Sequence, residues 1–181
     1  MIAQLCPMSG STIIDAGCGR GDLLDYLIEI DRRPRQYIGV DALEEMVAAA
    51  LEKKLPNAEF VHEDFFANPA VLRRYQPAII VYSGSLNTMD DSEFFLALNT
   101  AVGIAEIGVI FNFLSTRFNQ GCVDDSGIAR RHPPDLVVGK MLEWDLNRIE
   151  LRHDYLEDHD CTIAAWKSSD SAAASAPGQT D

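Results

Sequence analysis

Cysteine and basic charge are scarce in this sequence. Its four cysteines, Cys6, Cys18, Cys122 and Cys161, are scattered and form no CxxC pair. A zinc cluster and a disulfide framework are therefore poorly supported; we predict no metal site and buried thiols. The chain has 15 Lys and Arg against 28 Asp and Glu, a net charge of −13. Because a protein that neutralises phosphates needs a basic face, we expect no nucleic acid partner.

Long apolar runs are also missing. No segment approaches the roughly 18 apolar residues that span a bilayer, and the first residues lack the basic start and apolar stretch of a signal peptide. We therefore expect a cytoplasmic protein with no membrane partner. The length of 181 residues predicts one domain, 1–167. The small polar residues of 168–181 predict a disordered tail.

Strand-like and helix-like segments alternate along the first two thirds of the chain. The expected strands are 12–16, 36–41, 59–64, 78–84 and 107–115, and the expected helices are 22–30, 43–55, 69–75 and 93–105. This alternation is typical of a doubly wound α/β sheet with right-handed crossovers. An aperiodic polar loop at 116–134 and a helix at 135–146 follow. The last two strand-like runs, 148–157 and 160–167, leave no room for a crossover helix, so they must pair as an antiparallel hairpin.

The stretch 15-DAGCGRG-21 joins the first strand to the first helix. In doubly wound sheets, ligands bind beyond the carboxyl ends of the strands, near the point where the strand order reverses. Gly17, Gly19 and Gly21 remove side chains from that place and permit the positive φ of a tight turn. A glycine-rich turn alone is weak support for a ligand site, so the neighbouring residues decide.

An aspartate closes each of the first three expected strands: Asp15, Asp41 and Asp64. The Asp41 carboxylate is placed to accept hydrogen bonds from both hydroxyls of a ribose. The Asp64 carboxylate is placed to accept one from an adenine amino group. The dinucleotide fingerprint G-x-G-x-x-G would require glycine where Asp22 stands, and no Gly-Lys-Ser/Thr of a P-loop follows. Acids around the loop repel a pyrophosphate and suit a ligand that carries an ammonium and a sulfonium.

The segment 14-IDAGCGRGDLLDYL-27 resembles the first motif of class I S-adenosylmethionine-dependent methyltransferases. Further segments resemble their later motifs, partly those of small bacterial members: 37-YIGVD-41, 60-FVHEDFF-66, 82-YSGSLN-87, 109-VIFNFLS-115 and 151-LRHDY-155. The similarity covers about residues 11–167. It implies a Rossmann-like, doubly wound, seven-stranded sheet, mostly parallel, with an antiparallel C-terminal hairpin like the one expected independently above.

By position, the resemblance also implies the residues that bind S-adenosyl-L-methionine. The amino-acid part would be held by Asp15 and the backbone of Gly17, Cys18, Gly19 and Gly21. The adenosyl part would be held by Asp41 at the ribose and by Ala42, Asp64 and the Phe65 amide at the adenine. Ser83, after the fourth strand, would lie beneath the cofactor and face its methyl group.

The implied activity is methyl transfer to an oxygen or nitrogen of a small-molecule or biosynthetic-intermediate acceptor. Such a displacement needs mainly alignment in a dry site, and a general base only when the acceptor is protonated at rest. The candidate catalytic residues are therefore weak: Asn87, which equally suits a turn cap, and His132, which is otherwise a solvated loop residue. Ser83–Leu86 replaces the Asn/Asp-Pro-Pro-aromatic motif of amino-methylating DNA enzymes.

Only eleven residues precede the first expected strand, whereas most members of the family carry lid helices there. The site is then open to a bulky acceptor, completed by a second subunit (a homodimer or a different partner), or covered by 116–134; a truncated start is a further explanation. The missing lid also motivates an alternative function, a non-catalytic S-adenosylmethionine-binding subunit. Asp22 argues against a third reading, an NAD-dependent oxidoreductase.

Overall fold

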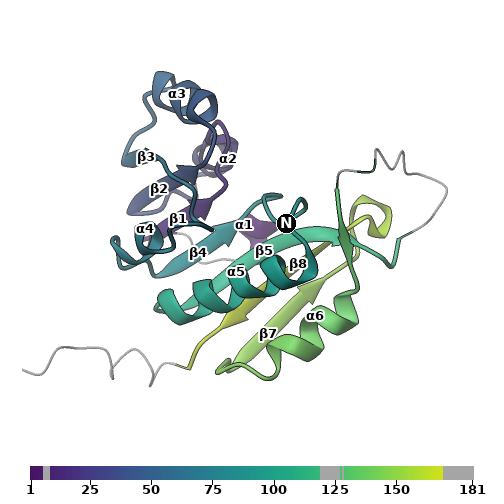
Figure 1. The fold of residues 1–181 in the computed structure, drawn as a ribbon. Coiled ribbons are helices and arrows are strands. Elements are labelled where there is room, and N and C mark those ends of the chain that lie inside the picture. Colours follow the sequence, from purple (N-terminus) through teal and green to yellow (C-terminus); the bar gives the residue numbers. More distant parts are fainter. Residues whose placement is uncertain (6–8, 119–126, 128, 169–181) are drawn as a thin grey trace, which may run out of the picture.

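The computed structural model describes residues 1–5, 9–118, 127 and 129–168 (Figure 1). The predicted tail, 168–181, lies outside the described residues except for its first residue. Part of the predicted loop 116–134 also lies outside them, as do Cys6 and Cys122. Both described cysteines, Cys18 and Cys161, are buried free thiols, as predicted.

The described strands form one eight-stranded sheet. They are β1 Thr12–Ala16, β2 Gln36–Asp41, β3 Ala58–His62, β4 Ile79–Tyr82, β5 Gly108–Ser115, β6 Arg131–His132, β7 Arg148–Arg152 and β8 Asp160–Trp166. Seven of them follow the order β3-β2-β1-β4-β5-β8-β7, and β8 runs antiparallel to both β5 and β7. The predicted doubly wound sheet with an antiparallel C-terminal hairpin is confirmed. The two-residue β6, which pairs with the end of β5, lies where a loop was predicted.

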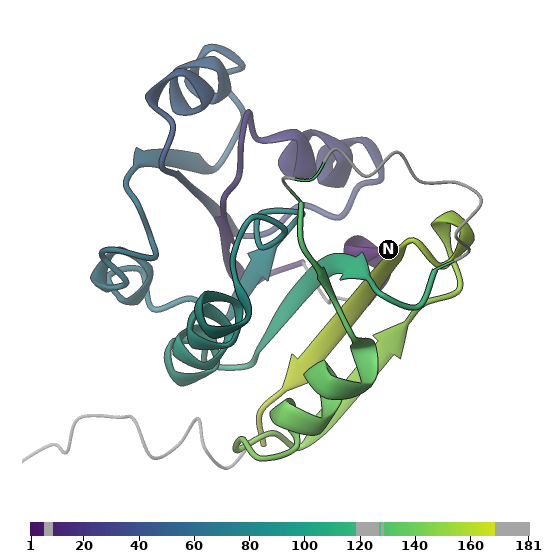
Figure 2. The same ribbon diagram turned by 45° about the vertical axis from the view of Figure 1, so that its right-hand side comes forward.

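Helices cover both faces of the sheet (Figures 1 and 2). They are α1 Ile2–Leu5, α2 Asp22–Glu29, α3 Glu44–Glu52, α4 Ala70–Arg73, α5 Asp91–Ile104 and α6 Pro134–Met141, with a 3-10 turn, η2, at Leu156–Asp158. One apolar cluster packs the sheet against α4, α5 and α6, and the other packs the opposite face against α1 and α2. Every residue of β1 is buried, because a central strand of such a sheet is covered on both faces.

The start of α5 shows how local sequence fixes the elements around the site. The Asp90 side chain accepts a hydrogen bond from the Glu93 amide, and the Glu93 side chain accepts one from the Asp90 amide. This reciprocal arrangement satisfies backbone donors that the first helical turn leaves free. This cap fixes where the connection from β4 ends and α5 begins.

The strand order reverses between β1 and β4. The chain passes from β1 to β2 and β3 in one direction, and from β4 to β5 in the other. A crevice forms at the carboxyl ends of strands where such a reversal occurs, so the glycine-rich loop after β1 and the segment after β4 lie together. Among the described residues, no helix is long and apolar enough to cross a membrane.

Candidate functional site

The glycine-rich loop between β1 and α2 has a left-handed backbone at Gly17, Gly19 and Gly21, with φ of 78°, 52° and 75°. A Cβ on Gly17 would lie 2.2 Å from the Cβ of Ser85, and one on Gly21 would lie 2.9 Å from the Phe60 ring. Around Gly19, no such contact lies within 4 Å. The predicted positive φ is confirmed at all three glycines. Gly17 and Gly21 also make room for protein neighbours, whereas Gly19 faces open space.

Asp15 lies inside β1 rather than at its end, and it is 1% exposed. Its Oδ2 accepts a hydrogen bond from the Tyr37 hydroxyl, whereas its Oδ1 is buried and has no partner. Burial raises the pKa of Asp15 to about 7; the Tyr37 hydrogen bond opposes this rise, and the nearby Asp41 carboxylate adds to it. A buried polar atom without a partner is costly. The orphaned oxygen can therefore accept a hydrogen bond from a donor of a ligand.

Asp41 ends β2, as predicted, and connects two loops. Its Oδ2 accepts a hydrogen bond from the Gly19 amide at 2.8 Å, and its Oδ1 accepts one from the Leu43 amide at 2.9 Å. A carboxylate offers about four acceptor positions, so lone pairs remain for hydroxyl groups of a ligand. The negative charge of Asp41 thus lies directly beside the open part of the glycine-rich loop.

The residues predicted to surround an adenine follow β2 and β3. Asp64 lies two residues beyond the end of β3, is exposed, and accepts a hydrogen bond from the Phe66 amide through Oδ1. Ala42 is also exposed, whereas the Phe65 side chain is buried against Tyr82 with ring centroids 5.6 Å apart. Asp64 and Ala42 are therefore accessible to a ligand, and Phe65 can contribute only through its backbone.

Cys18 contributes packing to the loop rather than a reactive group. Its side chain is 7% exposed, and its Sγ lies 2.7 Å from where a Cβ on Gly39 would be placed. Burial raises the pKa of this thiol far above its ordinary value. A thiol is reactive as the thiolate, so Cys18 is inert and offers a ligand only its backbone.

A cavity of about 350 Å³ lies at the carboxyl ends of β4 and β5. Parts of α1, α2, η2 and the start of β8 complete its wall. Its polar lining consists of Asp22, Ser83, Asn112, Tyr155, Asp160 and Thr162. Ser83 therefore lies in the cavity wall, next to the glycine-rich loop, where the resemblance places a group facing the methyl. A volume of this size is at the lower end for small-molecule sites.

Sequence reasoning missed Asn112 and Asp160. Asn112 interrupts the otherwise apolar strand 109-VIFNFLS-115, which was the available signal. Asp160 begins β8 and pairs with Leu114, while Asn112 pairs with Thr162, so Asn112 and Asp160 are diagonal neighbours on one face. Their side chains form a hydrogen bond of 3.1 Å. Only the register of the β5–β8 pair brings them together.

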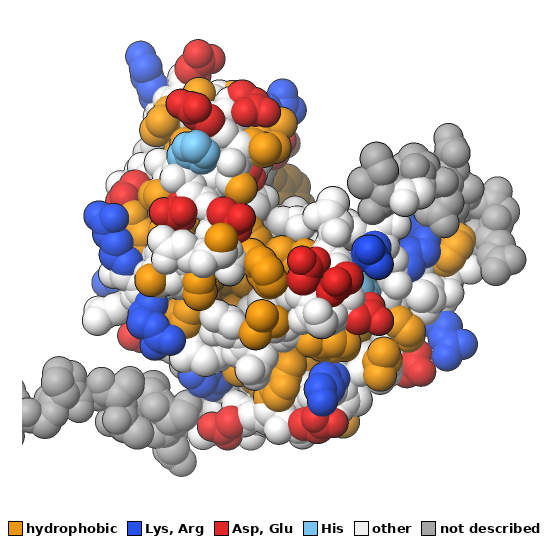
Figure 3. All heavy atoms as spheres, viewed as in Figure 1, with side chains coloured by type: hydrophobic (Ala, Val, Ile, Leu, Met, Phe, Trp, Pro, Cys, Tyr) orange, Lys and Arg blue, Asp and Glu red, His pale blue; other side chains and the backbone are white. Residues whose placement is uncertain are grey.

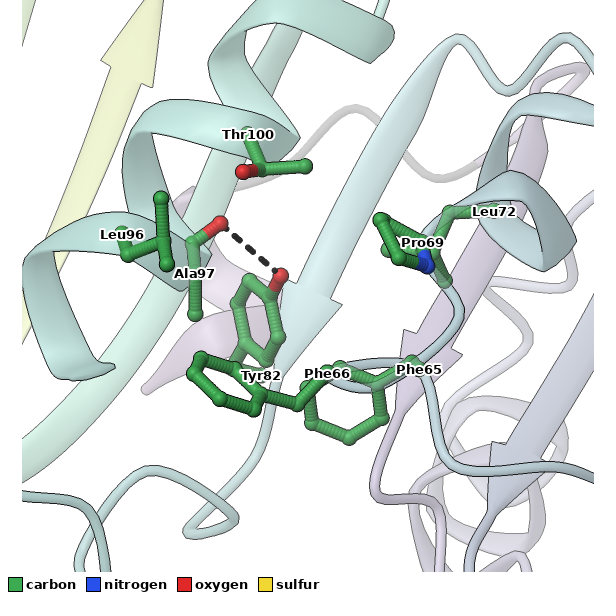
Figure 4. Close-up of a pocket in the computed structure, with 8 residues that line it drawn as sticks. All are labelled: Phe65, Phe66, Pro69, Leu72, Tyr82, Leu96, Ala97 and Thr100. Carbon is green, nitrogen blue, oxygen red and sulfur yellow. Dashed lines mark hydrogen bonds between the residues drawn. The ribbon is translucent and has the colours of Figure 1, made fainter.

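A second cavity, of about 130 Å³, lies between the end of β4, α4 and α5 (Figure 4). Its polar lining groups are the hydroxyls of Thr100 and Tyr82, and the Tyr82 hydroxyl is directed at the Ala97 carbonyl 3.3 Å away. No charged side chain lines it, so it suits only a small apolar group. Among the described residues, no group of three or more His, Cys, Asp or Glu could hold a metal ion.

Asn87, the first candidate catalytic residue, links the segment after β4 to β5 and to the residue before β6 through hydrogen bonds. Its Oδ1 accepts a hydrogen bond from the Leu114 amide at 3.2 Å, and its carbonyl accepts one from the Arg130 amide at 2.6 Å. It lines neither of the two cavities. Its place supports the structural alternative, in which the residue holds a turn, rather than a catalytic role.

His132, the second candidate, is buried rather than solvated. It is 1% exposed in β6, its ring stacks on Phe94 with centroids 4.0 Å apart, and its Nδ1 lies 3.0 Å from Asp91 Oδ1. Burial lowers the pKa of this imidazole, although Asp91 opposes the change. Since it also lies outside the two cavities, its position gives no support to a catalytic role.

The state of Asp15 gives a prediction for stability. Its folded pKa of about 7 lies above the ordinary value of 3.8, so the folded chain holds one more proton than the unfolded chain between these pH values. Stability must therefore fall as pH rises through this window, by up to about 4 kcal/mol. Asp15→Asn should be as stable as the wild type at pH 4 and more stable at pH 8, as measured by urea unfolding. If the stabilities of the wild type and Asp15→Asn instead changed in parallel between pH 4 and pH 8, Asp15 would be ionised throughout this range, which would contradict the prediction.

Comparison with known proteins gives the family. A family model described as a methyltransferase domain matches residues 13–104, half of the chain. The chain belongs to this methyltransferase family. The matched half runs from β1 to the end of α5, and it contains the glycine-rich loop, Asp41 and Asp64. The resemblance to class I S-adenosylmethionine-dependent methyltransferases is thereby confirmed. A search of curated protein sequences finds no match.

Solved structures show the same fold at low sequence identity. Magnesium protoporphyrin IX methyltransferase from Synechocystis PCC 6803, with bound SAM, is 17% identical, with a TM-score of 0.66 over 92% of this chain and 74% of that chain. An O-methyltransferase family protein from Burkholderia thailandensis is 14% identical, with a TM-score of 0.72 over 93% and 54%. A SAM-dependent methyltransferase from Archaeoglobus fulgidus is 15% identical, with a TM-score of 0.70 over 89% and 88%. These similarities establish the fold.

Proposed function

We propose that the chain binds S-adenosyl-L-methionine and transfers its methyl group to an oxygen or nitrogen of a small-molecule acceptor. The observation that carries the proposal is the buried, unpartnered Oδ1 of Asp15 in the strand that leads to the loop bridged by Gly19 and Asp41. A hydrogen-bond donor of the ligand, such as its ammonium, would satisfy this oxygen. The solved structure with bound SAM that shares this fold supports the same ligand.

The residues at this edge of the sheet fit the whole ligand. Asp15 would accept a hydrogen bond from the ammonium, and the backbone of Gly19 would lie against the amino-acid part. Asp41 keeps lone pairs for the ribose hydroxyls, and the exposed Asp64 keeps its second oxygen for the adenine amino group, with Ala42 beside the ring. When bound, the cofactor supplies a methyl group on a sulfonium. The surrounding carboxylates attract the positive charge of this sulfonium.

Positioning is the main task of the chain in this reaction. Ser83 lies between the cofactor residues and the cavity of about 350 Å³, so an acceptor held there would approach the methyl group from the side of β4. Alignment of nucleophile and methyl can supply most of the acceleration. The transfer itself then requires no side chain with a perturbed pKa. This agrees with the structural roles of Asn87 and His132.

The acceptor in this proposal is a small molecule. On the face shown in Figure 3, Lys and Arg side chains are dispersed among Asp and Glu rather than gathered into one basic patch. With a net charge of −13, such a surface favours neither nucleic acid nor another polyanion. The cavity also favours an enzyme over a non-catalytic cofactor-binding subunit, because a subunit of that kind needs no room for an acceptor.

Calorimetry with S-adenosylmethionine, S-adenosylhomocysteine and NAD tests the proposal. We expect dissociation constants in the micromolar range for the first two, that is, about −8 kcal/mol, and little binding of NAD, since Asp22 begins α2 where a pyrophosphate would lie. Binding of NAD in preference to the other two ligands would contradict the proposal. Formation of S-adenosylhomocysteine from S-adenosylmethionine with added acceptors then separates an enzyme from a binding subunit.

A further inference from the structure

The charged side chains that line the large cavity, Asp22 and Asp160, are both acidic, and Met1, which carries the α-amino group, also belongs to the lining. Asp22 is neutralised by Lys53, whose Nζ lies 2.7 Å from Asp22 Oδ1, and by Arg20 at 3.7 Å. Asp160, by contrast, has the imidazole of His159 beside it, with Nδ1 2.7 Å from Asp160 Oδ1. It is 14% exposed, so its charge lies in a largely desolvated place at the start of β8.

Hydrogen bonds hold Asp160 in one orientation. Arg131 Nη2 lies 2.9 Å from His159 Nε2, and a guanidinium has only donors, so Nε2 must be the acceptor. The proton of the His159 ring is then on Nδ1, which donates to Asp160 Oδ1 at 2.7 Å. His159 therefore links Arg131 to Asp160 through its two ring nitrogens.

The second oxygen of Asp160 is fixed from β5. Asn112 Nδ2 donates to Asp160 Oδ2 at 3.1 Å, while Asn112 Oδ1 accepts from the Gly84 amide at 2.7 Å, which sets the orientation of the Asn112 amide. Each oxygen of Asp160 thus has one protein donor and keeps a lone pair for a ligand. A carboxylate held in this way in a cavity wall is a preorganised acceptor of hydrogen bonds.

We infer that the acceptor is an amine with an apolar body, that its nitrogen donates a hydrogen bond to Asp160, and that this nitrogen is the atom methylated. The inference rests on the proposed function and narrows it. Leu23, Tyr26 and Leu156 give the cavity an apolar wall for the body of the molecule. A carboxylate, phosphate or phenolate would meet the charge of Asp160; no Lys, Arg or His lines the cavity, and the α-amino group of Met1 is the one cationic group among the lining residues.

The direction of charge movement favours nitrogen. An amine that rests as the ammonium ion first releases one proton to solvent. The lone pair of the free base then forms the new N–C bond as the S–C bond breaks, and the electron pair of the broken bond stays on sulfur. The positive charge therefore passes from sulfur to nitrogen, beside the Asp160 carboxylate, which stabilises it more in the transition state than in the ground state. The alkylated nitrogen then loses one N–H proton to solvent. A hydroxyl acceptor would instead need a base to form an oxyanion, which Asp160 would repel.

Binding to the protein saturated with S-adenosylhomocysteine tests this inference without turnover. The probes are phenethylamine, tryptamine and benzylamine, each with its alcohol and carboxylate counterpart of the same body. We expect at least one amine to bind at least tenfold more tightly than its alcohol, and the carboxylates to bind not at all. Asp160→Asn should weaken binding of that amine by about 10- to 100-fold and change binding of S-adenosylhomocysteine by less than twofold.

Two further variants keep the result interpretable. Asp145→Asn removes a charge from an exposed position beyond α6 and should leave amine binding unchanged. If Asp160→Asn fails to fold, Tyr26→Ala tests the same cavity from α2, where the side chain is 46% exposed and its loss should be tolerated; it should weaken amine binding severalfold. The inference is overturned if no amine binds better than its alcohol, or if folded Asp160→Asn retains full amine affinity. Failure of the wild type to bind S-adenosylhomocysteine would instead overturn the proposed function.

Discussion

Asp41→Asn is expected to weaken binding of S-adenosylhomocysteine by about 10- to 100-fold, which corresponds to the hydrogen bonds of one charged group. The substitution keeps the shape of the side chain and removes its charge. It also replaces one acceptor oxygen by an NH₂ group, which only donates. The side chain can then no longer accept hydrogen bonds from both the Gly19 amide and the Leu43 amide through two separate oxygens. The loss should appear in calorimetric titration as a weaker dissociation constant.

A matched control separates this loss from a general effect of charge. Asp145→Asn also removes one negative charge, but from an exposed position after α6, so it should bind S-adenosylhomocysteine like the wild type. Thermal melting of Asp41→Asn without ligand shows whether the loop between β1 and α2 still folds. If a folded Asp41→Asn protein bound S-adenosylhomocysteine as tightly as the wild type, Asp41 would not be part of the binding site.

Gly17→Ala should destabilise the fold by about 3 kcal/mol, although alanine adds only one methyl group. The new Cβ would lie 2.2 Å from the Cβ of Ser85, and the φ of 78° is costly for any residue with a side chain. Ser85 cannot move away freely, because its hydroxyl donates to the Ala16 carbonyl at 2.6 Å. Urea unfolding measures the change in the free energy of unfolding.

Gly19→Ala provides the comparison within the same loop. Its φ of 52° is also left-handed, but nothing lies within 4 Å of the new Cβ. Only the backbone cost of about 1–2 kcal/mol should therefore remain. Equal destabilisation of the two variants would show that Ser85 does not pack against Gly17 as described, and that backbone conformation alone requires these glycines.

The sheet could be predicted because its strands carry local signals. The apolar run 78–84 and the short spacing between the last two strands lead directly to β4 and to the antiparallel β7–β8 hairpin. Two elements could not be found in this way. The helix α1 has four residues, too few for a period to appear, and β6 has two residues, Arg131 and His132, with no apolar pattern. Pairing with β5, not local sequence, makes β6 a strand.

The site could be predicted only in part. Position along the chain located the glycine-rich loop and Asp41 correctly, because both follow predicted strands directly. It placed Asp15 at a strand end, whereas the residue lies within β1, and burial there changes its pKa. Asp160 could not be found, because its place beside Asn112 depends on the register between strands far apart in the sequence.

The central claim, that the loop after β1 with Asp15 and Asp41 binds an adenosyl ligand, is tested most directly by a crystal structure of the protein grown with S-adenosylhomocysteine. We predict that the ligand ammonium lies within hydrogen-bond distance of Asp15 Oδ1, that the ribose hydroxyls contact Asp41, and that the sulfur points past Ser83 into the large cavity. Electron density for the ligand at any other place, with Asp15 Oδ1 still without a partner, would contradict the claim.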